Sequence, residues 1–438
     1  MRRLWWRGVV IALCLVVVGF TPAWTAQQEV TLRVMIPEHH RLIKPLEEND
    51  RSSVVPRRLW FYDMVQSFKK RYPHIKLRFE SAVYDHVTSI FINKSMAGDP
   101  PDITFLPNGP QFKLARAGYL YPLDRFPFDW KDYNENMLRE NMTVDGKIYL
   151  VPTYTVPHVL YYNKEIYEKA GIKEPPKTWD ELIAVAKKLT KDTKGEGKID
   201  VWGLGMPASP SHPPFVYQSL EPIIWLLGGK LEEKGRALID TPEMRKAVQL
   251  YVDLVHVHKV MPEAVTTWDK EYMANFRNEK LAMTLRGAEE YVPSVAKLGD
   301  KVGLARVPVF KPGDRPYTWM EVWGYGMSKR AGETKPEAAW AFLNQFASEE
   351  TFVLAAEFQK GLPTRKSVAN HPIYKSSPEF EFQAKYVVEA GRADPFIEEW
   401  EAWGDIISRT AQAAVLRLGK VEDLLKNAQR EYDARLKR

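Results

Sequence analysis

Apolar strand-like segments alternate with amphipathic helical segments along the first third of this chain. The order is a strand at 31–36, a helix at 57–72, a strand at 75–81, a helix at 87–97, a strand at 102–106 and a helix at 111–117. Such alternation predicts an α/β fold with a mostly parallel sheet covered by helices on both faces. Ligands of these sheets bind beyond the carboxyl ends of the strands, so the loops after Ile36 and Leu106 are candidate site loops.

The run from residue 146 to residue 182 contains its own turn signals. Asn163 is expected to cap a helix that Gly171 ends, and Thr178 with Glu181 forms a Thr-x-x-Glu capping box for the next helix. A second α/β region is expected to start after the stretch 152–157. Its helices are predicted at 164–170, 179–190, 217–227 and 242–258, and a strand is predicted at 303–308.

Two polar inserts interrupt the pattern, at 38–56 and 191–198, and both are expected to be surface loops. Near the other end of the chain, Ser348 is expected to cap a helix that Gly361 terminates. The last part of the chain, from about residue 378, is predicted to be almost wholly helical.

The N-terminus resembles a secretory signal. Basic residues precede an apolar run at 9–20, and the small residues Ala23 and Ala26 follow it. We expect residues 1–26 to be a signal peptide, because the apolar run is shorter than the ~20 residues that a spanning helix needs. An uncleaved anchor is the alternative. The mature chain is thus expected to be periplasmic or otherwise extracytoplasmic.

The composition excludes some classes of protein. Cys14 is the only cysteine and lies inside the apolar run, so neither disulfides nor a lipid anchor on a mature cysteine are expected. The formal net charge of +6 includes three arginines of the signal, and basic and acidic residues are interspersed. Nucleic-acid binding is therefore not expected. A chain of 438 residues exceeds a single core and predicts two or three domains.

Five motifs in the right order resemble the extracellular solute-binding proteins of ABC importers, family 1, the sugar-binding and maltose-binding-protein-like family. The motifs lie at 68–77, at 97–103 with 117–124, at 146–182, at 276–283 and at 361–367. The resemblance implies a two-lobed periplasmic binding protein type II fold with the ligand cleft between the lobes. It also implies a monomer without cofactor or metal that binds a sugar or oligosaccharide and delivers it to permease subunits in the membrane.

By this resemblance each lobe is built from two stretches of chain. The N-terminal lobe would comprise 27–153 and 325–374, and the C-terminal lobe 157–320 and 378–438. Hinges would fall near 153–157, 320–325 and 374–378.

The resemblance also suggests ligand-binding positions on both lobes and on the hinges. They are His39, Asn108, Tyr154, Thr155, Tyr217, Gln218, Glu289, Glu321, Trp323 and Trp403. Trp403 matches a family stacking platform, with Trp323 and Tyr217 expected as its neighbours. Glu289 stands where the family has another aromatic platform, and Val156 stands where it has a glutamate. These departures argue against a maltodextrin pocket.

Two questions stay open at this level. A secreted carbohydrate-active enzyme is the alternative function, since Glu398, Glu399 and Glu401 form an acid cluster beside tryptophans, as in glycosidases. Consecutive glutamates at a helix start more commonly complement the helix dipole, so we expect no enzyme. The second question is whether the solute is neutral or anionic. His39, His40 and Arg286 favour an anion, whereas Glu289 and Glu321 oppose one.

Overall fold

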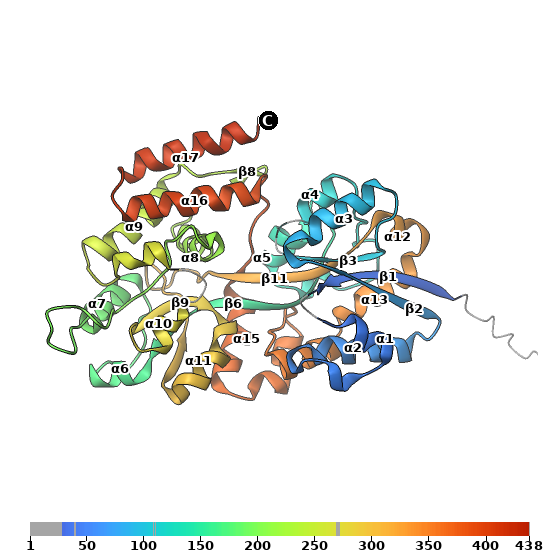
Figure 1. Cartoon of the computed structure of the whole chain (residues 1–438), viewed down its shortest axis with the longest axis horizontal. Coiled ribbons are helices and arrows are strands. Elements are labelled where there is room, and N and C mark those ends of the chain that lie inside the picture. The colour runs from blue at the N-terminus through green and yellow to red at the C-terminus, as the bar shows by residue number, and fades with distance from the viewer. Residues whose placement is uncertain (1–28, 39–40, 108, 110, 269–271, 438) are drawn as a thin grey trace, which may run out of the picture.

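The structure is a computed structural model that describes residues 29–38, 41–107, 109, 111–268 and 272–437. Two α/β bodies lie side by side, and two long strands run through the middle of the molecule from one body to the other (Figure 1). These strands are β6, Val151–Asn163, and β11, Thr318–Met327. No helix in the described ranges combines the length and the apolar character that crossing a membrane requires.

One sheet extends through both bodies. The strand order is β10-β6-β11-β3-β1-β2, with β9 paired to β6 and β12 paired to β11. Besides β6 and β11, the sheet contains β1 Val30–Pro37, β2 Ile75–Ala82, β3 Ile103–Leu106, β9 Met283–Gly287, β10 Val302–Ala305 and β12 Gly391–Arg392. Two small hairpins, β4 Thr143–Val144 with β5 Lys147–Ile148 and β7 Glu232–Glu233 with β8 Arg236–Ala237, lie outside it.

The prediction of a mostly parallel sheet was wrong. The parallel pairs are β1 with β2, β1 with β3, and β11 with β12. β11 is antiparallel to both β3 and β6, and β6 is antiparallel to β9 and β10. The alternating pattern predicted the parallel pairing correctly where helices connect neighbouring strands, as between β1, β2 and β3. It failed at β11, which enters the sheet from a distant part of the chain without a crossover helix.

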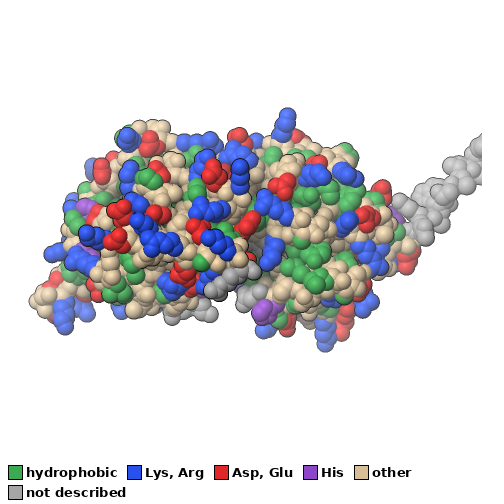
Figure 2. Space-filling view, turned by 90° about the horizontal axis from the view of Figure 1, so that it is seen from above, with side chains coloured by type: hydrophobic (Ala, Val, Ile, Leu, Met, Phe, Trp, Pro, Cys, Tyr) green, Lys and Arg blue, Asp and Glu red, His purple; other side chains and the backbone are tan. Residues whose placement is uncertain are grey.

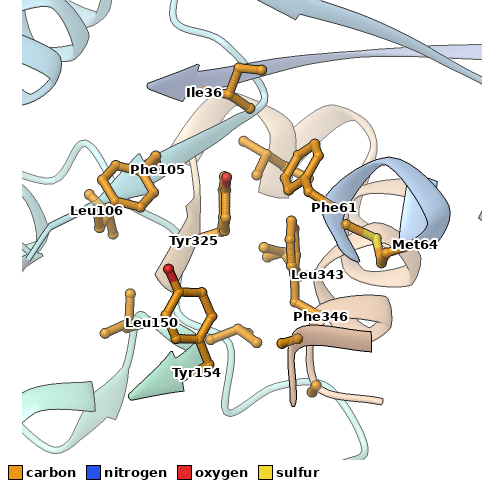
Figure 3. Close-up of a cluster of buried hydrophobic side chains, with 14 of the residues drawn as sticks. Ile36, Phe61, Met64, Phe105, Leu106, Leu150, Tyr154, Tyr325, Leu343 and Phe346 are labelled. Atoms are coloured by element: carbon orange, nitrogen blue, oxygen red, sulfur yellow. The ribbon is translucent and has the colours of Figure 1, made fainter. Parts of the chain in front are cut away.

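The first body has its own hydrophobic core. Its helices are α1 Ile43–Glu48, α2 Leu59–Arg71, α3 Val87–Met96, α4 Gln111–Arg116, α5 Glu135–Met137, α12 Lys329–Thr334, α13 Pro336–Phe346 and α14 Glu349–Gln359. Helix α2 turns Phe61, Met64 and other apolar residues at helical spacing inward, onto the sheet (Figure 3). Tyr325 of β11 stacks on Phe346 of α13 with ring centroids 4.2 Å apart, which fixes the crossing strand to this core.

The second body surrounds a separate core and a smaller apolar cluster to which α10 and α11 contribute. Its helices are α6 Lys164–Lys169, α7 Trp179–Leu189, α8 Pro213–Leu226, α9 Pro242–His256, α10 Met273–Arg277, α11 Tyr291–Leu298, α16 Trp400–Val415 and α17 Val421–Arg435. The predicted caps are confirmed: Asn163 accepts a hydrogen bond from the backbone of Ile166, and Thr178 with Glu181 forms the capping box.

The chain passes between the two cores within β6 and β11. Val156 belongs to the first core and Leu160 to the second, while Trp319 belongs to the second and Met320 to the first. Helix α15, Pro378–Ala390, lies beneath the crossing strands in Figure 1 and contributes to the first core through Phe380. The molecule therefore narrows to a few chain segments between its two bodies.

Three local predictions need correction. The 38–56 insert is not simply a surface loop, because α1 lies within it and Leu42, Leu46 and Val54 are buried. The helix after Ser348 ends at Gln359, and the left-handed residue that caps it is Lys360 (φ 56°) and not Gly361. Helix α8 begins at Pro213, four residues earlier than predicted, because prolines fit the first turn of a helix.

Candidate ligand cleft

The crossing of β6 and β11 forms the centre of the site. Oγ1 of Thr155 donates a hydrogen bond of 2.5 Å to the carbonyl oxygen of Glu321 on the neighbouring strand. The backbone of Thr155 also exchanges hydrogen bonds with Leu362, at 3.1 and 3.3 Å. The Thr155 side chain is completely buried, so it fastens three segments of chain together at this point.

An irregularity in β11 gives Trp323 its position. The strand register shifts between Val322 and Gly324. A Cβ atom on Gly324 would lie 2.4 Å from the carbonyl oxygen of Val151, so only glycine permits this approach of the two strands. Trp323 remains half-buried at the irregularity, while Tyr325 turns into the core.

Aromatic rings line the first-body side of the crossing. Tyr154 lies edge-on between Trp60 and Trp323, with centroid distances of 5.6 and 5.3 Å. Nε1 of Trp323 donates to the hydroxyl of Tyr84 at 3.2 Å, and Gln359 donates to the hydroxyl of Tyr154. Burial raises the pKa of Tyr154 to about 12, so its hydroxyl stays protonated. These rings present both apolar faces and polar edges.

A cavity of about 850 Å³ opens beside these rings, and both bodies contribute to its wall. Its lining residues are Arg57, Tyr154, Val156, Ala288, Glu289, Tyr291, Val292, Pro293, Trp323, Phe358, Gln359, Lys360, Gly361, Leu362, Ser376, Ser377, Phe380 and Gln383. A concave, largely apolar space with a few polar groups, of this size and between two bodies, is typical of a small-molecule site.

Acidic residues gather on the second-body side. Glu321 is half-buried, and burial together with the nearby carboxylate of Glu289 raises its pKa to about 8. The guanidinium of Arg286 pairs with Glu289 at 3.0 Å and lies 3.8 Å from the ring centroid of Phe215. Arg286 therefore already has an anionic partner within the protein, Glu289.

Helices α8 and α16 add an aromatic wall next to these acids. The ring of Tyr217 on α8 lies 5.3 Å from Trp400 and 5.2 Å from Trp403, between ring centroids. Trp403 is only 1% exposed, whereas Trp400 is half-buried. The side-chain oxygen of Gln218 is buried and has no hydrogen-bond partner among the residues that the structure describes.

The structure brings many of the candidate residues of the sequence analysis to this region. Tyr154, Glu289 and Trp323 line the cavity, Thr155 and Glu321 lie at the strand crossing, and Tyr217, Gln218 and Trp403 lie on the α8–α16 wall. His39 and Asn108 lie outside the described residues. None of the three acids proposed for an enzyme is among the lining residues of the cavity, and the exposed Glu398 has its Oε1 3.9 Å from Nη1 of Arg116.

Sequence reasoning missed several residues of the site. They are Arg57, Phe358 and Phe380, which line the cavity, and Glu221, Asp394 and Trp400, which lie near Tyr217 without lining it. The Asp394-Pro395 pair was a detectable turn signal after the last short strand. The others reach the site only through tertiary packing, so no local pattern marks them.

The face of the molecule seen from above carries both signs of charge. Figure 2 shows lysine and arginine side chains interleaved with aspartate and glutamate over the upper face of both bodies. Within the described residues, no group of three or more His, Cys, Asp or Glu side chains is arranged to hold a metal ion.

Comparison with known proteins identifies the class to which this fold and site belong. Residues 63–382 match the family described as bacterial extracellular solute-binding protein, and the chain belongs to this family. Its members are solute-binding proteins of ABC transporters and not enzymes.

Individual relatives agree with this assignment over most of the chain. A binding protein of Brucella abortus is 26% identical over 392 residues, 86% of this chain and 90% of the relative. The arabinooligosaccharide-binding protein of Halalkalibacterium halodurans is 24% identical over 73% of this chain and 72% of its own. The structure of maltose-bound MalE3 of T. maritima is 26% identical and covers 92% of this chain and 99% of its own, with a TM-score of 0.67. The two-lobed α/β fold expected from the sequence is thus confirmed.

Proposed function

We propose that this protein captures a carbohydrate or a related polar solute between its lobes and presents it to the permease of an ABC importer. The cavity of about 850 Å³ carries the proposal, because both bodies and the crossing strands line it. Its aromatic rings suit the C–H faces of sugars, and its buried polar groups suit their hydroxyls. The names of the relatives that bind arabinooligosaccharides and maltose support this class of ligand.

For the lobe boundaries we propose those that the family resemblance suggests. The N-terminal lobe comprises 27–153 and 325–374, and the C-terminal lobe comprises 157–320 and 378–438. The hinges lie near 153–157, 320–325 and 374–378. The change of core between Val156 and Leu160, and between Trp319 and Met320, supports the first two hinges. Rotation of the lobes at these three hinges would open the cleft and close it around a solute. The permease of an ABC importer distinguishes the closed form from the open form.

The proposed contacts come from both lobes and the hinges. The family resemblance suggests His39, Asn108, Tyr154, Thr155, Tyr217, Gln218, Glu289, Glu321, Trp323 and Trp403. Because Trp403 is only 1% exposed, we assign the solute-facing ring of α16 to its half-buried neighbour Trp400. Ser376 and Ser377 add hydroxyl groups at the third hinge. Secretion through the 1–26 signal, a periplasmic location and a monomeric state complete the proposal, and the mass of the exported chain would test the cleavage site.

A thermal-shift screen with mono-, di- and acidic oligosaccharides tests the function. A solute present at 100 times its Kd stabilises the protein by about 2.7 kcal/mol, and closure should reduce the radius of gyration in solution scattering. The same mixtures are assayed for new reducing ends. Hydrolysis products without any thermal shift would replace the binding function with the enzyme alternative.

A further inference from the structure

Arg58 is the one arginine among the described residues whose side chain is buried. It precedes α2 and is only 6% exposed. Its Nη1 donates to Oε1 of Gln359 at 3.2 Å, and its guanidinium also lies within reach of the Tyr154 hydroxyl. Its buried Nε has no hydrogen-bond partner in the described part of the chain. Gln359 and Tyr154 are both neutral, so neither of them balances the charge of Arg58.

The half-buried arginines in the described part of the chain all have a carboxylate partner. The pairs, at 2.5 to 3.0 Å, are Arg33 with Glu80, Arg245 with Asp240, Arg277 with Glu290, Arg286 with Glu289, Arg365 with Asp132 and Arg392 with Glu140. Arg58 is more deeply buried than any of them and has no such partner among the described residues. Burial lowers the pKa of Arg58, but a guanidinium stays charged at neutral pH. Because a buried charge without a counter-charge is costly, an anion from outside the chain would complete this position.

Arg58 lines a small pocket of about 40 Å³ whose other walls are mostly aromatic. The rings are those of Trp60, Tyr84, Phe105, Tyr154, Trp323 and Tyr325. Figure 3 shows three of them, Phe105, Tyr154 and Tyr325, close together on β3, β6 and β11. Since one water molecule needs about 10–15 Å³ of such space, the pocket accommodates a group of roughly three heavy atoms. A carboxylate has this size.

The pocket adjoins the ligand cavity of the cleft. Tyr154 and Trp323 line both spaces. Gln359, which accepts the hydrogen bond from Arg58, also lines the larger cavity. A solute that occupies the cavity can therefore place one small group beside Arg58 while its sugar rings stay in the larger space.

The charges around the cavity are divided between the lobes in the same sense. Arg57 and Lys360 line the cavity from the N-terminal lobe, and both are exposed. Glu289 lines it from the C-terminal lobe, where it is already paired with Arg286. The positive wall thus lies on the side of Arg58, and the acidic wall suits the hydroxyl groups at the other end of a solute.

We propose that Arg58 binds a carboxylate of the solute, so that the preferred solute is a uronic acid or an oligosaccharide that contains one. A carboxylate is planar and accepts two hydrogen bonds from a guanidinium, and this pairing is strong where aromatic walls exclude water. A phosphate or sulfate group has more atoms than a pocket of this size accommodates. This inference rests on the proposed function and deepens it.

The test compares sugars that differ in one group. Isothermal titration with the full mature chain measures binding of glucuronate, galacturonate and trigalacturonate, of their neutral methyl esters, of glucose and galactose, and of galactose 6-phosphate. We expect each acid to bind at least tenfold more tightly than its ester, and the phosphate to bind more weakly than galacturonate.

Equal or tighter binding of a neutral sugar, from this set or from the wider panel, would overturn the inference and leave the sugar-binding function intact. Tighter binding of the phosphate than of the uronates would overturn the choice of a carboxylate. Failure of these sugars and of the whole wider panel would reject both the inference and the proposed function.

Two variants and a matched control link the preference to Arg58. Arg58→Gln removes the charge and should reduce the acid-to-ester affinity ratio at least tenfold. Arg71→Gln is the control, because Arg71 lies at the other end of α2 and pairs with Glu350 at 3.1 Å, and it should leave the ratio unchanged. If Arg58→Gln does not fold, Arg58→Lys keeps the charge but not the planar set of donors, and it should still reduce the ratio at least threefold. Unchanged ratios in the folded Arg58 variants would contradict the assignment.

Discussion

The carboxyl group of Glu221 lies fully buried against that of Asp394, whose Oδ1 accepts a hydrogen bond of 2.5 Å from Nε1 of Trp319. Trp319 thereby stabilises the charged form of Asp394, while Glu221 has no comparable donor. Burial and the neighbouring Asp394 raise the pKa of Glu221 well above its usual value. The pair therefore holds a proton in the folded protein that an unfolded chain would release near pH 4.5.

The first prediction concerns the pH dependence of stability without ligand. Because the folded pKa of Glu221 is raised, its contribution is fully present below the unfolded pKa and is lost as pH rises toward the folded pKa. The wild-type protein should lose up to about 1.4 kcal/mol per pH unit from this group above pH ~4.5. Glu221→Gln should be more stable than the wild type at pH 8, by a margin that shrinks toward pH 5. Urea unfolding at several pH values measures this margin.

Glu422→Gln is the matched control, because Glu422 is exposed and pairs with Arg245 at the surface. Its stability profile should run parallel to that of the wild type. A parallel profile for Glu221→Gln as well would show that Glu221 holds no extra proton.

The second prediction concerns proton release on binding. The pKa of Glu321 is about 8 in the structure, so the group is mostly protonated at pH 7. Donors from a bound solute favour its carboxylate form, so binding should release part of a proton and affinity should rise from pH 6 to pH 8. Calorimetry in buffers of different ionisation enthalpy counts the released protons. Glu321→Gln should abolish most of the release, and a release equal to that of the wild type would assign it to another group.

Local chemistry made part of this fold predictable. The cap of Asn163 and the capping box of Thr178 and Glu181 depend only on residues within a few positions, and the structure forms both. The order of strands and helices was predictable for the same reason, because it depends on residues close together in the sequence. The pairing of β11 with β3 and β6 could not be predicted, because it joins residues more than 160 positions apart and follows no local pattern.

The sequence predicted which residues lie near the cleft but not which side chains surround them. Resemblance pointed to Tyr217, Glu289 and Trp323, which the structure brings to the cleft region. It did not indicate that Arg286 pairs with Glu289, nor that Glu221 meets Asp394, since each depends on side chains from separate elements. The charge character of the cleft therefore emerges only from tertiary structure.

The third prediction concerns the strand crossing. Gly324→Ala places a Cβ against the backbone oxygen of Val151, which cannot move without disturbing β6. Overpacking of this kind costs about 1–3 kcal/mol, so the variant should unfold at lower urea concentration. Gly326→Ala is the control, because its shortest new contact, 2.7 Å, is with the movable side-chain end of Leu106. Equal losses in the two variants would show that the crossing tolerates the change.

The last prediction separates the two tryptophans of α16. Trp403 lies 1% exposed in the core of the C-terminal lobe, and its truncation to alanine should cost about 3–5 kcal/mol of unfolding free energy. Trp400 packs against the same core but stays half-buried, with its ring 4.6 Å from that of Trp403. Trp400→Ala should cost less stability and should weaken solute binding about tenfold, which corresponds to roughly 1.4 kcal/mol and is typical of a lost aromatic stack. Urea unfolding and titration of both variants measure the two quantities independently. If Trp403→Ala instead loses affinity while its ligand-free stability is unchanged, Trp403 is the stacking platform suggested by the family resemblance, and Trp400 only supports it.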